Sequence, residues 1–325
     1  MRHRGIHVRA MGNIIRVRTN RGYEPLMIDF KPISYTDKAI FDKYWYDGIE
    51  KGCELTFSNI YAWGEQFFAE ISGNIVILSR FGEYAVYRYP IGHGDKRAAV
   101  DAIMLDSRER GIPLVIGGMT RESVKELDNL YNGLFKFKYN DSSYDYVYDI
   151  DVLASLKGRK FHGKRGHIKK FVTAYPDYKV EEISKNTLPR VKNFIDLWFQ
   201  RRAEEGESDY GLEKEAISRA LGAFDELSLD GILLIADGEV VAVTLGSIMS
   251  EDTFDVQYEK ALWDVDGAYP TINREFAKYL KNKYPFLTYL NREEDMGIEG
   301  LRKAKESYQP HRRIIKCKAI YRGEG

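Results

Sequence analysis

The stretch FFAEISGNIVIL, residues 67–78, consists of two apolar runs that meet at Gly73. Apolar runs of this length joined by a glycine-containing turn are typical of a β-hairpin. A second stretch of the same kind, LLIADGEVVAV at residues 233–243, turns at Gly238. The two glycines are 165 residues apart, which is about one domain length. This spacing indicates that the chain contains one structural unit twice.

The elements that follow the two hairpins occur in the same order. Each hairpin is followed by an extended segment, near 84–88 and 254–259, and then by a helical segment, near 95–110 and 268–283. Such alternation of extended and helical periodicity predicts a mixed sheet flanked by helices. We therefore expect an α/β (α+β) protein with two tandem domains. Their expected bounds are residues 27–155 and 156–325.

Residues 1–26 differ from the rest of the chain. They contain six arginines and one glutamate, whereas the whole chain has 49 basic and 49 acidic residues. The segment lacks the apolar core of a secretory signal and has no clear amphipathic period. A capping pattern, Ser34 followed by Asp37, opens the first expected helix. We therefore expect residues 1–26 to be a disordered or non-native tail.

The composition excludes several classes of protein. A hydrophobic fraction of 44% and a charged fraction of 30% are those of a globular protein, and a net charge of zero provides no global attraction for nucleic acid or membranes. Cys53 and Cys317 cannot form a disulfide framework, which suits a cytoplasmic location. Without a long apolar run, we expect no integral membrane association. His162 and His167 have no carboxylate or thiolate nearby in sequence, so we expect no metal site.

The segment KGRKFHGKRGHIKK, residues 157–170, contains seven lysines and arginines and no acid. Ammonium and guanidinium groups packed this densely beside glycines can surround a phosphate-containing anion. A solvated linker is the alternative, although linkers usually carry charges of both signs. The candidate phosphate ligands in this segment are Lys164, Arg165 and His167.

A second polar constellation is LNREEDMGIEGLRKAKESYQP, residues 290–310, in which a short strand ends in an acidic turn and a helix follows. Ligand contacts often lie where a strand of a mixed sheet ends. Arg302 and Lys305 are three residues apart, so both can reach one anion. We expect the helix to bury Tyr308 and to turn Lys305 outward. The same charges also suit a helix dipole without any ligand. The candidate bases are Glu259, Glu293, Glu294 and Asp295, and the candidate substrate ligands are Asn291, Arg302 and Lys305.

Three motifs, together with the tandem arrangement, carry a resemblance to a known family. They are ELTFSNIYAWG at 54–64, GRKFHGKRGHIKKF at 158–171 and NREEDMGIEGLRKAKESYQP at 291–310. Over roughly residues 28–322 the chain resembles bacterial proteins related to the C-terminal domain of phosphatidylglycerol lysyltransferase. The resemblance implies two fused GCN5-related N-acetyltransferase (GNAT) folds, as in Fem-type transferases that move amino acids from aminoacyl-tRNA. In related transferases a lysine near the C-terminus contacts phosphate, and Lys305 in AKESYQP carries over.

The resemblance leaves three functions open. The first is direct acyl or aminoacyl transfer to an amine or hydroxyl, with aminoacyl-tRNA or an acyl-CoA as co-substrate. The second is acetyl-CoA-dependent N-acetylation. The glycine turn disfavours it, because three residues separate Arg88 from Gly92 where the acetyl-CoA motif has two. The third is a noncatalytic module that binds a nucleotide or RNA through the basic segment.

Overall fold

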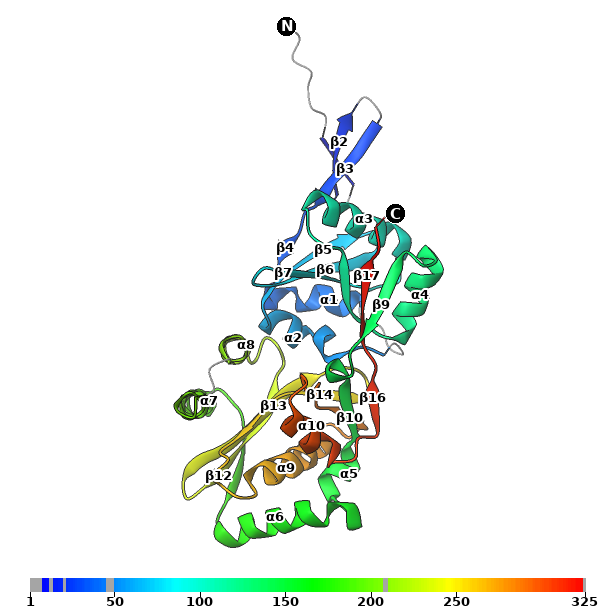
Figure 1. Cartoon of the computed structure of the whole chain (residues 1–325). Coiled ribbons are helices and arrows are strands. Elements are labelled where there is room, and N and C mark those ends of the chain that lie inside the picture. The colour runs from blue at the N-terminus through cyan, green and yellow to red at the C-terminus, as the bar shows by residue number, and fades with distance from the viewer. Residues whose placement is uncertain (1–7, 12–13, 20–21, 45–49, 207–209, 324–325) are drawn as a thin grey trace. The chain divides into compact units, whose positions relative to one another are not determined.

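The protein, described here as a computed structural model, contains two compact units (Figure 1). The structure describes residues 8–11, 14–19, 22–44, 50–206 and 210–323. Unit 1 comprises residues 1–52, 64–141 and 315–325, and unit 2 comprises residues 53–63 and 142–314. Each unit is built on a seven-stranded mixed sheet flanked by helices, which confirms the expected fold class. No helix within the described ranges is both long enough and apolar enough to cross a membrane.

The sheet of unit 1 has the strand order β4-β5-β6-β7-β8-β17-β9, and only β7 and β8 pair in parallel. Its strands are β4 (Lys31–Pro32), β5 (Glu65–Ile71), β6 (Asn74–Phe81), β7 (Tyr84–Arg88), β8 (Val115–Met119), β9 (Phe135–Tyr139) and β17 (Cys317–Tyr321). Its helices are α1 (Lys38–Tyr44), α3 (Lys96–Glu109) and α4 (Arg121–Tyr131). Val100 and Ile103 of α3 share a buried apolar core with Leu78 and Tyr87 of the sheet.

The sheet of unit 2 repeats this arrangement. Its order is β11-β12-β13-β14-β15-β10-β16, and again only the fourth and fifth strands pair in parallel. Its strands are β10 (Asp145–Asp149), β11 (Lys179–Glu182), β12 (Asp230–Ala236), β13 (Glu239–Ile248), β14 (Thr253–Ala261), β15 (Tyr289–Asn291) and β16 (Arg312–Ile314). Its helices are α2 (Phe57–Ala62), α5 (Ile150–Ser155), α6 (His162–Ala174), α7 (Leu188–Glu204), α8 (Gly211–Gly222), α9 (Ala268–Lys283) and α10 (Glu299–Glu306).

Both expected hairpins are present. β5 and β6 are joined at Ser72 and Gly73, and β12 and β13 are joined at Asp237 and Gly238. All four turn residues have positive φ, between 49° and 84°, as a two-residue type I′ turn requires. The first turn lies one residue earlier than Gly73 and Asn74, the pair at which the two apolar runs meet in the sequence.

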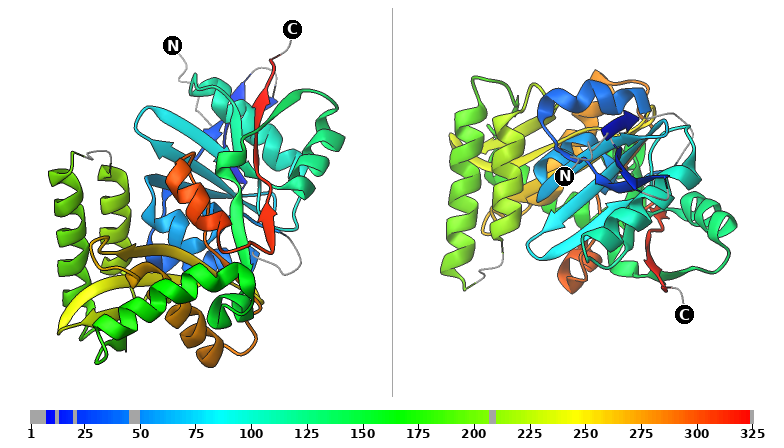
Figure 2. Two further views of the ribbon diagram at one scale, coloured as in Figure 1. Left: turned by 60° about the horizontal axis from the view of Figure 1, so that its bottom comes forward. Right: turned by 90° about the horizontal axis from the view of Figure 1, so that it is seen from above.

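The helices of unit 2 cover its sheet in two groups. α9 packs on β12, β13 and β14, and α5 and α6 contact α9 in turn. α7 and α8 lie side by side in both views of Figure 2. α7 begins with a proline in its first turn, where a missing N–H costs no hydrogen bond, and it buries Val191, Phe194 and Trp198.

The sixth strand of each sheet comes from the other half of the chain. β10 precedes the expected boundary at residue 155 but pairs with β15 and β16 of unit 2, while β17 inserts between β8 and β9 of unit 1. The division of the chain therefore differs from the expected 27–155 and 156–325. Sequence order cannot reveal this exchange, because strand pairing over such distances has no local signal. Its result is that Asp145 and Tyr146 belong to unit 2.

The structure assigns three strands that begin within the expected disordered tail: β1 (Val8–Met11), β2 (Ile14–Thr19) and β3 (Gly22–Ile28), which form an antiparallel sheet in that order. Residues 1–7 lie outside the described part of the chain. The stretch IIRVRT alternates apolar residues with arginine, and this period of two is the strand signal that the arginine count obscured.

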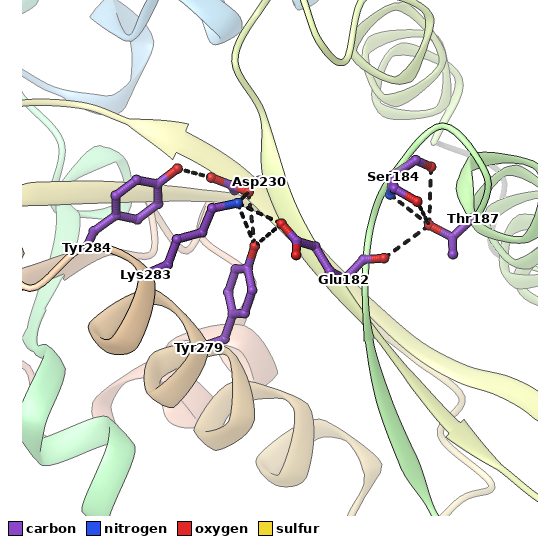
Figure 3. Close-up of polar contacts among 7 residues, drawn as sticks. All are labelled: Glu182, Ser184, Thr187, Asp230, Tyr279, Lys283 and Tyr284. Carbon is purple, nitrogen blue, oxygen red and sulfur yellow. Dashed lines mark hydrogen bonds and ion pairs between the residues drawn. The ribbon is translucent and has the colours of Figure 1, made fainter.

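A polar cluster joins the end of α9 to the edge of the unit 2 sheet (Figure 3). Lys283 Nζ donates hydrogen bonds to Asp230 Oδ1 at 2.6 Å and to Glu182 Oε1 at 2.7 Å. The Tyr279 hydroxyl donates to Glu182 Oε1 at 2.6 Å, and the Tyr284 hydroxyl donates to Asp230. Burial would lower the pKa of Lys283, but these acceptors outweigh it and raise the pKa. The cluster therefore stabilises the docking of α9.

Lys283→Met should destabilise the protein by about 1–3 kcal/mol, because the buried Asp230 carboxylate would lose its cation. In a domain of this size the unfolding midpoint should fall by roughly 2–4 °C per kcal/mol. Thermal unfolding followed by circular dichroism would measure the change. Lys278→Met on the exposed face of α9 is the matched control. Equal midpoints for the two variants would contradict a stabilising role for the cluster.

Candidate active site

The site begins where two strands of unit 2 separate. β14 and β15 pair in parallel only over Thr253–Asp255 and Tyr289–Asn291; β15 then ends, while β14 continues to Ala261. Glu293, two residues beyond β15, has φ +56°. A left-handed conformation at a residue other than glycine is strained, and such residues concentrate at functional sites. The end of β15 therefore directs the polar turn at 291–295 into the opening beside β14.

Two asparagines fix the position of Glu293. Asn291 Oδ1 accepts a hydrogen bond from the Glu293 backbone N–H at 2.8 Å, and Asn291 Nδ2 donates to Asp145 Oδ2 at 2.9 Å. Asn59 of α2 donates from Nδ2 to Glu293 Oε1 at 2.8 Å and to Asp255 Oδ2 at 3.1 Å. Asn59 of α2 thus holds the side chain of Glu293 and Asn291 of β15 holds its backbone, while carboxylates of β10 and β14 hold the two asparagines.

Lys305 of α10 is buried against this turn, with only 7% of its surface exposed. Its Nζ donates hydrogen bonds to the carbonyl oxygens of Arg292 and Glu294, each at 2.5 Å. The expected outward orientation of Lys305 is therefore wrong, although Tyr308 is buried as expected and only 5% exposed. The apolar stripe of the helix predicted the wrong face, because the turn before α10 presents carbonyl oxygens that attract the ammonium group.

The environment brings the pKa values of Glu293 and Lys305 together. Burial raises the pKa of Glu293 to about 8, against the hydrogen bond from Asn59 and the positive charge of Lys305. Burial lowers the pKa of Lys305 to about 8, and the positive charge of Arg292 acts in the same direction. Groups that exchange protons near neutral pH suit general acid–base catalysis.

The other candidate bases have different partners. Burial would raise the pKa of Asp295, but hydrogen bonds from Arg302 and Tyr146 outweigh it and lower the pKa to about 2. Glu259 is bound by Arg292 at 2.7 Å and by Asn273 at 3.1 Å. Asp295 and Glu259 therefore position neighbouring groups. Arg302 forms an ion pair with Asp295.

Glu294 belongs to a group with Cys53 and Asp145 whose sulfur and oxygen atoms lie within 4.8 Å of one another. These residue types include zinc ligands. The Cys53 thiol, however, donates to Asp145 Oδ1 at 3.3 Å, and the Cys53 backbone N–H donates to Asp145 Oδ2 at 2.8 Å. The arrangement thus works as a hydrogen-bonded support for Asn291.

The basic segment contributes one residue to the site. Lys164 Nζ lies 4.0 Å from the centroid of the Tyr308 ring. Arg165 instead donates to the carbonyl oxygens of Leu156 and Gly158, and His167 Nδ1 lies 2.7 Å from Asp266 Oδ1. Of the three residues expected here as phosphate ligands, only Lys164 is near the polar turn.

Sequence reasoning missed Arg292, Asn59 and Asp145. Arg292 stands inside the quoted motif beside Glu293, and that position was a usable signal. Asn59 lies within ELTFSNIYAWG, but nothing local connects it to a residue 234 positions away. Asp145 reaches the site only through the exchanged strand β10.

Two mixed sheets of equal strand order, each with one parallel pair, define a tandem GNAT-like protein. The family model described as "Phosphatidylglycerol lysyltransferase, C-terminal" matches residues 49–316. The chain belongs to this family. The sequence-based recognition is therefore confirmed.

Three solved structures are similar to this chain. A conserved protein of unknown function from Bacteroides thetaiotaomicron VPI-5482 is 34% identical, with a TM-score of 0.84 and coverage of 91% of this chain and 100% of that one. L-PGS from Bacillus licheniformis is 16% identical, with a TM-score of 0.65 and coverage of 91% and 94%. FemX is 10% identical, with a TM-score of 0.56 and coverage of 90% and 97%. No curated protein matches the chain.

Proposed function

We propose that this protein transfers an aminoacyl group from aminoacyl-tRNA directly to an amine or hydroxyl acceptor. The family is named for a lysyl transfer to phosphatidylglycerol, and that class of chemistry supports the proposal. The observation that carries it is the buried carboxyl group of Glu293, close enough to Lys305 to feel its positive charge, where β14 and β15 separate. Glu293 is a positioned carboxylate with a raised pKa, which is what a general base for this reaction requires.

The proposed step needs no covalent intermediate on the enzyme. The acceptor nitrogen or oxygen forms a bond to the ester carbonyl carbon of the donor, and the bond from that carbon to the ribose oxygen breaks. Glu293 takes the acceptor proton and returns it to the ribose oxygen. Lys305 stabilises the ionised form of Glu293, because its positive charge lowers the pKa of that carboxyl group.

A transfer assay tests this function. The protein would be incubated with tRNAs that each carry one labelled amino acid, in the presence of a lipid extract or a soluble metabolite extract as the source of acceptor. We expect label to leave the RNA for an acceptor faster than with heat-denatured protein. If no charged tRNA loses its label above background, the protein is not an aminoacyltransferase, and the noncatalytic module becomes the better description.

The structure of the glycine turn bears on the acetyl-CoA alternative. A Cβ atom on Gly94 would lie 2.0 Å from the Ser72 carbonyl oxygen, so the glycine serves close packing against the β5–β6 hairpin. Asp95 caps α3 by accepting from the Ala98 N–H at 3.0 Å, which occupies a donor that a pyrophosphate would use. These contacts disfavour coenzyme A binding at this turn.

We therefore expect acetyl-CoA to leave the thermal unfolding midpoint unchanged. A ligand present at one hundred times its dissociation constant would add about 2.7 kcal/mol. Differential scanning fluorimetry with acetyl-CoA, and with coenzyme A as the matched control, would measure this. Saturable stabilisation at micromolar concentration would contradict the expectation and favour an N-acetyltransferase.

A further inference from the structure

Two cations of unit 2 approach one aromatic ring beside the proposed active site. Lys164 comes from α6, and its Nζ lies 4.0 Å from the centroid of the Tyr308 ring. Arg292 follows β15, and its guanidinium carbon lies 4.9 Å from the same centroid. We infer that Lys164 and Arg292 form a binding site for one phosphodiester group of the donor RNA. This inference rests on the proposed function.

Both cations have unused hydrogen-bond donors. Arg292 is oriented by Glu259, which accepts from Nη2 at 2.7 Å and is itself held by Asn273. Arg292 Nη1 is buried and has no hydrogen-bond partner among the residues that the structure describes. Lys164 is half-buried, and burial lowers its pKa, as does the positive charge of Arg292, against the charge of Glu259. Because buried donors are normally satisfied, the unpartnered Arg292 Nη1 indicates a missing acceptor, and the half-buried Lys164 lies beside the same ring.

The charge balance of the cluster identifies the class of anion. Lys164 and Arg292 carry two positive charges, and Glu259 supplies one negative charge, so one positive charge remains. A phosphodiester carries one negative charge and offers two oxygens for charge-assisted hydrogen bonds. A phosphomonoester, which approaches two negative charges at neutral pH, matches this balance less well. The site therefore suits a group esterified on both sides.

The position of the site relative to Glu293 fits a donor RNA. Arg292 and Glu293 are adjacent in the chain, so their Cα atoms are about 3.8 Å apart. The terminal nucleotide of an aminoacyl-tRNA carries its ester and its phosphodiester on the same sugar. A phosphodiester held by Arg292 would thus place the ester near Glu293, which is the positioning that a direct transfer needs.

The surroundings of Lys164 favour RNA over a lipid headgroup. A lipid headgroup presents only one phosphodiester group. Lys157, Arg159 and Lys160 precede it in the chain, are exposed and have no acid among them. Several adjacent cations match the successive phosphates of an RNA strand. We therefore assign the basic segment to the RNA that leads into the site.

Binding of uncharged tRNA to the full chain tests this assignment without requiring transfer. Fluorescence anisotropy between 50 and 200 mM salt would give the affinity and its salt dependence. Lys164→Ala should bind about tenfold more weakly, since a charge-assisted hydrogen bond typically contributes at least that factor. The slope of log affinity against log salt should fall by about 0.7, the value for one lost phosphate contact on a single strand. Lys164→Arg, which keeps the charge, should stay within about threefold of wild type.

Lys192→Ala provides the control, because Lys192 is exposed on α7 and outside the basic segment. It should bind tRNA as wild type does. Wild-type affinity in Lys164→Ala would overturn the inference, and so would a loss confined to vesicles of anionic phospholipid. If the transfer assay fails but Lys164→Ala still binds tRNA more weakly than wild type, the proposed function is overturned and the RNA-binding site is retained.

Discussion

Glu293→Gln is expected to lower the rate of aminoacyl transfer by about 10²- to 10⁴-fold, the usual contribution of a general base. Glutamine has the same shape and still accepts a hydrogen bond from Asn59, but it cannot take a proton from the acceptor. Initial rates with saturating aminoacyl-tRNA would measure the loss. Affinity for uncharged tRNA should be retained, because the substitution leaves Lys164 and Arg292 in place.

The pH profile gives an independent test of the same residue. The raised pKa of Glu293, about 8, means that the carboxyl group is mainly protonated at pH 6 and mainly ionised at pH 9. A general base acts in its ionised form, so kcat/KM should rise with pH through about pH 8. Glu299→Gln, an exposed acid at the start of α10, is the matched control. If Glu293→Gln transfers the aminoacyl group at the same rate and with the same pH profile as Glu299→Gln, Glu293 is not the general base.

Lys305→Ala is expected to lower the free energy of unfolding by about 1–3 kcal/mol, the cost of leaving buried acceptors without their donor. Two carbonyl oxygens would lose their donor, and Glu293 would lose its neighbouring positive charge. Urea unfolding followed by tryptophan fluorescence would measure the loss, since Trp63, Trp198 and Trp263 belong to unit 2. Lys303→Ala on the exposed face of α10 should change stability by less than about 0.5 kcal/mol. Equal urea midpoints for the two variants would show that the Lys305 contacts contribute nothing to folding.

The pH dependence of stability separates these two groups. Between about pH 4.5 and 8 the folded state holds a proton on Glu293 that the unfolded chain has lost, so stability should fall as pH rises. Between about pH 8 and 10.5 the unfolded chain holds a proton on Lys305 that the folded state has lost, so stability should recover. Glu293→Gln should abolish the fall. A fall of unchanged size in that variant would assign it to other groups.

The sequence predicted those parts of the fold that depend on local signals. Both hairpins have turn residues and apolar runs that are adjacent in the chain, and their recurrence indicated the duplication. The places of β10 and β17 depend on pairing between segments more than a hundred residues apart, so the expected boundary at residue 155 misplaced both strands. The strands in the first 26 residues were missed because the tail was predicted from the number of arginines and not from the alternation of apolar and polar residues in IIRVRT.

The candidate site was predictable to the extent that one motif contains it. Asn291, Glu293 and Lys305 all stand in NREEDMGIEGLRKAKESYQP, where the end of a strand and a charged helix were visible together. The different environments of these three side chains could not be predicted from the sequence. The backbone carbonyl groups that receive Lys305, the ion pair that occupies Asp295 and the approach of Asn59 all depend on how the chain turns after β15.

The insertion of β17 between β8 and β9 has a consequence for biosynthesis. A ribosome adds about 5–20 residues per second, so β9 emerges roughly ten seconds or more before β17 is made. During that interval β8 and β9 lack the strand that joins them, and unpaired strand edges favour association with other chains. The sheet of unit 1 cannot be completed until β17 has been made. A nascent chain stalled before residue 317 should therefore be a client for chaperones, whereas the released chain should not.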